Sequence, residues 1–199
     1  GSRGAMCGNG IRCVGKYVYD RKLTRKTCLT IDTDAGPRGL ELAVRGGKAE
    51  QVTVDMGQAI LYPEVELEAM GEQYTVHQVG VGNPHAVIFC PDPERVRLEE
   101  LGPVLECHPN LRERSNVEFV SCQDGHDLRV RVWERGSGIT LACGTGACAA
   151  FEAARQQGLC GSRAEARLPG GTLGLEWREG RIFMTGPART VFEGEIEMG

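Results

Sequence analysis

The sequence predicts an α+β fold with two pseudo-symmetric halves, each a curved, mainly antiparallel sheet wrapped around a central helix, with the first half incomplete. Three observations predict this fold. A Cys-Gly-x-Gly stretch occurs at 7–10 and again at 143–146, and each copy runs into a sequence that favours helix. Many short strand-forming stretches separated by glycine turns surround these two helices. About 84 residues of the second half (143 minus 59) precede its cysteine, but only six precede the first cysteine.

The first half is predicted to contain one short helix and three strands. Residues 11–19 follow the first Cys-Gly-x-Gly stretch and form a plausible helix. Glycine turns at Gly36-Pro37 and Gly46-Gly47 separate the stretches that favour strand. The predicted strands are residues 27–33, 40–44 and 51–56.

The second half is predicted to contain two helices among many strands, after a loop with Pro63 that crosses between the halves. Leu98, Leu101 and Leu105 recur at helical spacing, which predicts a helix over residues 98–107 that Pro103 could interrupt or restart. The second predicted helix covers residues 147–157. The predicted strands are residues 74–81, 85–90, 116–121, 127–134, 164–168, 172–177, 181–185 and 190–196.

The two halves are expected to divide the chain unevenly. The first should span residues 1–58 together with 188–199, and the second residues 59–187. A half that begins at its own central helix cannot wrap that helix in a sheet, so we infer that strands upstream of Gly1 are absent. Gly1-Ser2 could be a vector remnant or native sequence.

This asymmetry has an expected consequence for the first helix. Without upstream strands, the helix over residues 8–19 would expose an apolar face through Ile11, Val14 and Val18, which is unfavourable in water. The chain is expected to relieve this cost by pairing with a second copy, by swapping strands, or by leaving residues 1 to about 20 mobile. By itself the chain is expected to be inactive or nearly so.

Composition excludes several classes of protein. The chain of 199 residues is 41% apolar and 25% charged, as expected of an ordinary globular protein. A net charge of −4 gives no basic footprint for nucleic acid, and no stretch is long and apolar enough to cross a bilayer. No signal peptide is visible, and nine scattered cysteines suit a reducing cytoplasm better than a disulfide framework.

The repeated cysteines suggest a specific chemistry. Cys7 and Cys143 are each predicted at a helix N-terminus, where free N–H groups and the helix dipole favour a thiolate and a carboxylate. Two such groups on opposite faces of one carbon suit racemisation or epimerisation, because one thiolate removes a proton and the other thiol delivers one. A single glycine-flanked cysteine is more often a buried small residue, so the repetition carries this interpretation.

Six stretches resemble the diaminopimelate epimerase family, within the cofactor-independent racemase and epimerase superfamily. They occur in the family's order and span nearly the whole chain. Asn9 also separates the sequence from the similar proline racemase branch, which usually carries His there, and the phenazine-pathway relatives lack the paired cysteines. The stretches are MCGNGIRC (6–13), VDMG (54–57), GNPH (82–85), SNVEF (115–119), ERGSG (134–138) and ACGTGA (142–147).

The resemblance implies an isomerase that interconverts LL- and meso-2,6-diaminopimelate with no pyridoxal phosphate, metal or other cofactor, for lysine and peptidoglycan precursor synthesis. It also implies the corresponding two-half fold. The family has a further segment at the front, which supplies asparagines that hold the substrate. The partner would be a small molecule, with no nucleic acid or membrane, and a homodimer is possible.

The family's roles carry over residue by residue. Cys7 and Cys143 would be the acid–base pair, while His85 and Glu134 would tune the two thiols. Glu134 would also take an ammonium group, and Arg135 would grip the distal carboxylate together with two asparagines. The remaining substrate-binding residues would be Gly8, Asn9, Gly10, Gly144 and Thr145 at the helix N-termini, with Asn83 and Asn116 at the distal end.

Plainer interpretations and other functions stay open at this point. Asn83 before Pro84 is by itself a turn residue, and His85 on a strand is more often a satisfied core histidine. Cys13 and Cys148 are expected to be packing residues. The remaining cysteines, Cys28, Cys90, Cys107, Cys122 and Cys160, receive no function.

Three functional alternatives remain. The first is epimerisation of another amino acid. The second is a thiol redox or metal-binding protein, although neither motif has Cys-x-x-Cys spacing and no compact Cys/His set is present. The third is a non-catalytic remnant or one chain of a split enzyme.

Overall fold

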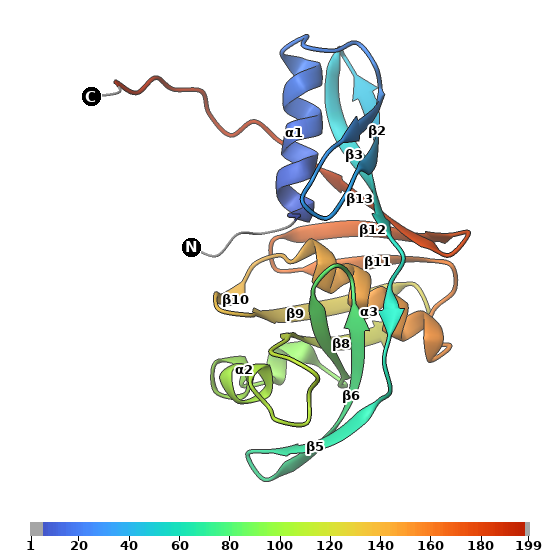
Figure 1. Ribbon diagram of the computed structural model, residues 1–199, viewed down its shortest axis with the longest axis vertical. Coiled ribbons are helices and arrows are strands. Elements are labelled where there is room, and N and C mark those ends of the chain that lie inside the picture. The colour runs from blue at the N-terminus through green and yellow to red at the C-terminus, as the bar shows by residue number, and fades with distance from the viewer. Residues whose placement is uncertain (1–5, 198–199) are drawn as a thin grey trace.

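The computed structural model describes residues 6–197 and shows the α+β fold that the sequence predicts (Figure 1). Three α-helices accompany one large mixed sheet in this part of the chain. The interpretation of Gly1-Ser2, and the last two residues of the 188–199 segment, lie outside the described residues. None of the helices within residues 6–197 is long and apolar enough to cross a membrane.

The first part of the fold is a helix packed on a small antiparallel sheet. Helix α1 (Gly8–Asp20) lies against β2 (Arg38–Arg45) and β3 (Lys48–Gly57), and β1 (Cys28–Ile31) pairs with β2. The last turn of the helix is tied to this sheet, because the Asp20 carboxylate accepts the N–H of the second residue of β3 at 2.9 Å.

The second part contains the other helices and most of the strands. Helix α2 (Leu98–Glu106) follows a short 3₁₀ turn, η1 (Pro93–Arg95), and helix α3 (Gly144–Gln156) follows the second Cys-Gly-x-Gly start. The strands are β4 (Ile60–Leu61), β5 (Val65–Ala69), β6 (Glu72–Gly80), β7 (Pro84–Phe89), β8 (Asn116–Gln123), β9 (Asp127–Glu134), β10 (Gly138–Thr140), β11 (Arg163–Leu168), β12 (Gly171–Arg178) and β13 (Arg181–Pro187).

The thirteen described strands form one continuous sheet in the order β1-β2-β3-β13-β12-β11-β9-β8-β7-β6-β4, with β10 on β9 and β5 on β6. Only the pairs β7–β8 and β9–β11 are parallel, so the sheet is mainly antiparallel, as predicted. Strand β13 pairs with β3, with Met184 opposite Val54, and this pair joins the two parts (Figure 1). The proposed division of the chain at residues 58 and 188 stays a prediction.

The two Cys-Gly-x-Gly helices differ in how far the sheet surrounds them. Helix α3 is buried at every position from Gly144 to Ala154, with β6 to β9 and β11 to β13 around it. Helix α1 buries only Gly8, Ile11, Arg12 and Gly15. The prediction of a central helix therefore holds fully for α3, whereas α1 buries one face.

Helix α2 forms a second, smaller core on the other face of the sheet. Leu98, Leu101 and Leu105 are buried there, as their spacing predicts, against Phe119 and other strand residues. Pro103 does not break this helix, which runs through it to Glu106.

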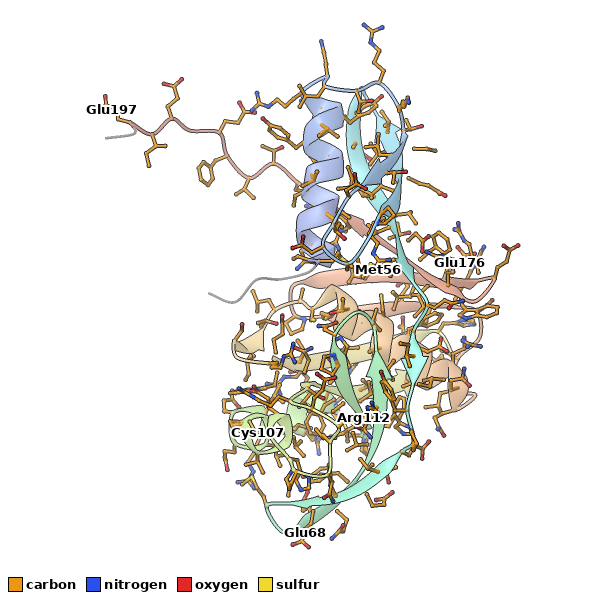
Figure 2. The ribbon with its side chains drawn as sticks, in the orientation of Figure 1. Met56, Glu68, Cys107, Arg112, Glu176 and Glu197 are labelled. Carbon is orange, nitrogen blue, oxygen red and sulfur yellow. The ribbon has the colours of Figure 1, made fainter. Side chains whose placement is uncertain are left out.

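Several expectations about single elements are wrong. Residues 190–196 form no strand, and Val191, Phe192 and Ile196 are 82–89% exposed, because no described strand lies beside them to accept their backbone hydrogen bonds. Figure 2 shows this segment running out to Glu197, away from the sheet.

The surface of α1 also differs in part from the prediction. Ile11 was expected on the exposed face but is 5% exposed, because it packs into the main core with residues of β2 and β3. Val14 is exposed and Val18 is half-buried. Cys13 was expected to pack inside the protein but is exposed, whereas Cys148 is buried as predicted.

Candidate active site

The two cysteines of the repeated stretch occupy the same local geometry. Cys7 is the N-cap of α1 with φ −123° and ψ 116°, and Cys143 is the N-cap of α3 with φ −121° and ψ 113°. In each case the sulfur accepts the backbone N–H three residues on, from Gly10 and from Gly146, at 3.4 Å. An N-cap side chain that accepts such a bond fixes the start of a helix, so the repeated sequence sets both helix starts.

The first turns of α1 and α3 meet each other. A Cβ built on Gly8 would lie 3.5 Å from the Gly144 Cα, and one built on Gly144 would lie 3.4 Å from the Gly8 Cα. Met184 packs against both glycines, and Met56 lies at the same junction (Figure 2). Glycine lets the two helix ends approach this closely, since a Cβ at either position would also crowd the Met184 side chain at 3.0–3.3 Å.

Two helix N-termini that meet in this way form an anion-binding arrangement. Each helix leaves its first N–H groups without intrahelical partners and carries a partial positive charge at this end. Asn9 reaches from one helix to the other, since its Nδ2 donates to the carbonyl of Ala142 at 3.4 Å. A carboxylate placed here would be bound from both helices.

Arg12 holds the first turn of α1 in place. It lies in the first motif, but the sequence analysis assigned it no role. Arg12 is 7% exposed, and its guanidinium donates to the carbonyl of Gly8 at 3.0 Å and to Oδ1 of Asn9 at 3.1 Å. Its Nε donates to the carbonyl of Pro187 in β13 at 3.4 Å. Arg12 therefore fixes the Asn9 amide and adds a positive charge behind the helix end.

The surroundings of the two thiols are unequal. Cys7 is exposed, whereas Cys143 is 6% exposed. Burial, followed by the nearby negative charge of Glu118, raises the pKa of the Cys143 thiol to about 12, and bonds from Thr145 and Gly146 offset only part of this effect. The helix N-terminal amide of Gly146 favours the Cys143 thiolate, as expected, but burial and Glu118 outweigh it, so this thiol carries its proton at neutral pH.

Glu118 is a second residue that the sequence reasoning missed. Its Oε1 lies 2.7 Å from Nδ1 of His85, both side chains are fully buried, and its Oε2 has no hydrogen-bond partner among the described residues. Burial raises the pKa of Glu118, and His85 opposes this effect. A Cβ on Gly146 would lie 2.6 Å from Oε1, so the carboxylate touches the first turn of α3. The available signal was a glutamate inside an otherwise apolar strand.

His85 lies between two oxygen atoms and does not stand alone in the core. Its Nε2 is 2.9 Å from Oδ1 of Asn83, while its Nδ1 faces Glu118. This chain of contacts holds the Asn83 side chain in one orientation. His85 is thus in contact with Glu118, whose negative charge raises the pKa of the Cys143 thiol.

Three of the predicted residues lie together at the ends of neighbouring strands, where β7 and β8 begin and β9 ends: Asn116, Glu134 and Arg135. Oδ1 of Asn116 accepts the N–H of Arg135 at 2.9 Å, and its Nδ2 donates to the carbonyl of Pro84 at 3.0 Å. One amide proton and one lone pair of Asn116 stay available for a ligand. The Arg135 side chain is 40% exposed, so its guanidinium can reach a ligand.

Glu134 lies at the end of β9 and also influences Cys143. Its Oε1 accepts the hydroxyl of Thr140 at 2.5 Å, and its charge adds to that of Glu118 in raising the pKa of Cys143. The structure therefore brings the predicted residues into one region with a helix-end part and a distal part. Within residues 6–197, no group of three or more His, Cys, Asp or Glu side chains is placed to hold a metal ion.

The comparisons with known proteins point to one family. The family model of diaminopimelate epimerase matches residues 1–62 and 77–191. A diaminopimelate epimerase of Methanococcus maripaludis (strain C5) is 46% identical over 213 residues, covering 100% of this chain and 77% of that protein. A diaminopimelate epimerase of Bacteroides thetaiotaomicron is 49% identical over 201 residues, covering 99% of this chain and 74% of that protein.

Solved structures share the fold at low sequence identity. A probable proline racemase from Agrobacterium radiobacter K84, with bound carbonate, has a TM-score of 0.80 at 15% identity and covers 98% of this chain and 68% of that chain. A phenazine biosynthesis protein of the PhzF family from Enterococcus faecalis has a TM-score of 0.72 at 18% identity and covers 98% and 74%. These likenesses show the fold alone.

Proposed function

The chain belongs to the diaminopimelate epimerase family, and from this premise we propose that it interconverts LL- and meso-2,6-diaminopimelate through Cys7 and Cys143. The observation that carries the proposal is the pair of N-cap cysteines with matching backbone geometry on two helix ends that meet. The reaction would use no pyridoxal phosphate or metal, and its products would serve lysine and peptidoglycan precursor synthesis.

The helix ends would bind the carboxylate beside the reacting carbon. The N–H groups of the first turns, at Gly8, Asn9, Gly10, Gly144 and Thr145, would donate to its oxygens. These groups would also stabilise the negative charge that develops on the carboxylate as the α-proton leaves. The helix positions are fixed before the substrate arrives, so this stabilisation needs little reorganisation.

Proton transfer would follow from the unequal thiols. Because Cys143 holds its proton at neutral pH, the first half-reaction would use the Cys7 thiolate as the base and the Cys143 thiol as the acid. The α-proton passes to the Cys7 sulfur, and the Cys143 proton passes to the opposite face of the carbon. This step leaves Cys7 as thiol and Cys143 as thiolate, the state that catalyses the reverse direction.

The distal end of the substrate would be held where β7 and β8 begin and β9 ends. Arg135 would bind the second carboxylate as a bidentate fork, and Glu134 would take the second ammonium group. Asn83 and Asn116 would add hydrogen bonds. This set favours a substrate with two amino-acid heads over a proline-type substrate, which has one.

The test is exchange of the substrate α-hydrogen with deuterated solvent, measured on the full-length enzyme. Cys7→Ala and Cys143→Ala should each abolish epimerisation, by a factor of about 100 or more, because each direction needs both a base and an acid. Cys13→Ala, which removes an exposed cysteine on the same helix as Cys7, is the matched control. Normal turnover by either alanine variant would refute the two-base scheme.

Two further measurements separate the proposal from its alternatives. A serine variant at one cysteine should still eliminate halide slowly from a halogenated analogue, because elimination needs only one base. Metal analysis of the purified protein, together with calorimetric binding of diaminopimelate, separates an epimerase from a redox or metal-binding protein. The expectation that this chain turns over little by itself stays a prediction, and the binding measurement does not depend on turnover.

We also propose a cytoplasmic homodimer. The nine cysteines, all free in the structure, support a reducing compartment. The apolar side chains of Val14 on α1 and of Phe192 in the final segment are exposed, which supports association. Sedimentation of the purified protein tests the dimer.

A further inference from the structure

A buried glutamate outside the proposed site holds the distal part of that site together. Glu106 ends helix α2, just before Cys107 (Figure 2), and is 4% exposed. Its Oε2 accepts the indole N–H of Trp133 at 2.7 Å. Its Oε1 accepts the guanidinium of Arg114 at 2.5 Å and the backbone N–H of Gly136 at 3.2 Å.

These donors belong to the two segments that carry the distal residues. Arg114 lies two residues before Asn116, and Gly136 directly follows Arg135. The backbone carbonyl of Glu106 also accepts the N–H of Ser115 at 3.1 Å. One residue of α2 is therefore hydrogen-bonded to both segments at once.

The two segments are also hydrogen-bonded directly to each other. The N–H of Arg135 donates to Asn116 at 2.9 Å, and its Nη1 donates to the carbonyl of Arg114 at 3.1 Å. Displacement of either segment would shift Arg135, because one bond holds its backbone N–H and the other holds its guanidinium. The position of the proposed carboxylate fork thus depends on Glu106.

The charge state of Glu106 suits this arrangement. Burial by itself would raise the pKa of its carboxyl group, but the hydrogen bonds from Trp133 and Arg114 outweigh burial and lower it. Glu106 is therefore ionised at neutral pH. An ionised carboxylate only accepts hydrogen bonds, which matches three donors, whereas an amide would direct its NH₂ group at one of them.

We propose that Glu106 is a positioning residue for the distal end of the substrate, acting through the backbone of Arg135 and the Asn116 amide. The predicted effect on substrate recognition rests on the proposed function. The hydrogen bonds from Glu106 to both segments, here called the Glu106 brace, are a property of the fold. It predicts that loss of the Glu106 charge weakens recognition of the second amino-acid head and leaves the reacting end nearly unchanged.

The first experiment tests the brace without any substrate. Hydrogen exchange of residues 113–116 and 134–138 is compared in the wild type, in Glu106→Gln and in Glu99→Gln, an exposed glutamate on the same helix. Glu106→Gln should speed exchange in these segments about tenfold, because a hydrogen bond to a charged group is lost. Unchanged exchange would overturn the brace.

The second experiment tests its consequence for recognition. Binding of diaminopimelate is compared with that of 2-aminoheptanoate, which has the same carbon chain without the distal amino and carboxylate groups. Glu106→Gln should weaken diaminopimelate binding about tenfold and leave 2-aminoheptanoate binding within about twofold. In the exchange assay the loss should fall on KM and not on kcat. Equal weakening of both ligands would overturn the positioning role.

Failure of this inference can be told apart from failure of the proposed function. If the wild type binds no diaminopimelate, the function fails, while the exchange data still decide the brace. Trp133→Phe removes one donor and keeps an aromatic ring against α2, so it provides a second variant if Glu106→Gln folds poorly. Trp133→Phe should also weaken diaminopimelate binding more than 2-aminoheptanoate binding, although by less than Glu106→Gln does. An equal effect on both ligands would contradict the proposal.

Discussion

Two cysteines with almost identical backbones have different surroundings in this protein. The repeated motif gives both an N-cap position and one sulfur-accepted N–H, so their local structure does not distinguish them. The distinction comes from burial and from the charge of Glu118, which lies on a neighbouring strand. In the proposed reaction, Cys143 is therefore the initial acid.

The charge of Glu118 can be tested through the reactivity of Cys143. Glu118→Gln removes a negative charge beside the thiol, so the Cys143 pKa should fall and its alkylation by iodoacetamide at pH 8.5 should speed up about tenfold for each pKa unit lost. Peptide mass spectrometry measures each cysteine separately. Cys148 is fully buried and reports on loosening of the fold: equal acceleration at both cysteines would contradict the electrostatic explanation.

Packing at the level of elements depends on glycine where two elements approach closely. Helix α2 crosses the ring of Trp133 at Gly102, where a Cβ would lie 2.4–2.6 Å from three ring atoms. The same ring donates its N–H to Glu106, four residues later on the helix. The position of α2, the indole and the Glu106 brace therefore depend on one small residue.

Gly102→Ala should destabilise the protein although alanine is the better helix former. Overpacking a filled site costs about 1–3 kcal/mol, whereas replacing glycine by alanine in a helix gains about 1 kcal/mol, so the cost should outweigh the gain. Urea unfolding measures the difference. Gly161→Ala is the control, because a Cβ there meets nothing within 4 Å. A more stable Gly102→Ala variant would show that α2 can shift away from the ring without cost.

At the scale of the whole molecule, the core contains several thiols that are kept protonated. Burial is the largest cause that raises the pKa of Cys143 to about 12 and of Cys160 to about 11, and it raises that of Cys148 further. In the unfolded chain these thiols ionise near pH 9. Their contribution to stability is therefore complete below about pH 9.

The free energy of unfolding should fall as the pH rises from about 9 towards 11. In that window the unfolded chain releases protons that the folded chain keeps, and each such thiol contributes a slope of about 1.4 kcal/mol per pH unit. Urea unfolding at pH 8, 9 and 10 measures the slope. Cys148→Ala should make it shallower, whatever its effect on stability at pH 8. An unchanged slope would mean that these thiols do not control the alkaline limit.

Much of the fold and of the proposed site follows from local sequence. The Cys-Gly-x-Gly repeat predicted both helix starts, because capping depends on the cysteine and the few residues after it. Strand-forming stretches between glycine turns predicted most strands, and helical spacing predicted the buried leucines of α2. The ordered motifs pointed to Asn83, His85, Asn116, Glu134 and Arg135, which the structure gathers into one region.

Only the tertiary structure decided how these residues act on one another. Residues 190–196 have a strand-like sequence but no described neighbour to pair with, and Cys13 and Ile11 exchanged their expected environments because burial depends on what packs against a helix. The raised pKa of Cys143 and the partners of Glu106 and Glu118 arise from residues distant in sequence. Helix capping depends on a few neighbouring residues, whereas desolvation, charge and the hydrogen bonds between elements depend on residues brought together in space. The sequence therefore predicts the first, and the assembled fold decides the rest.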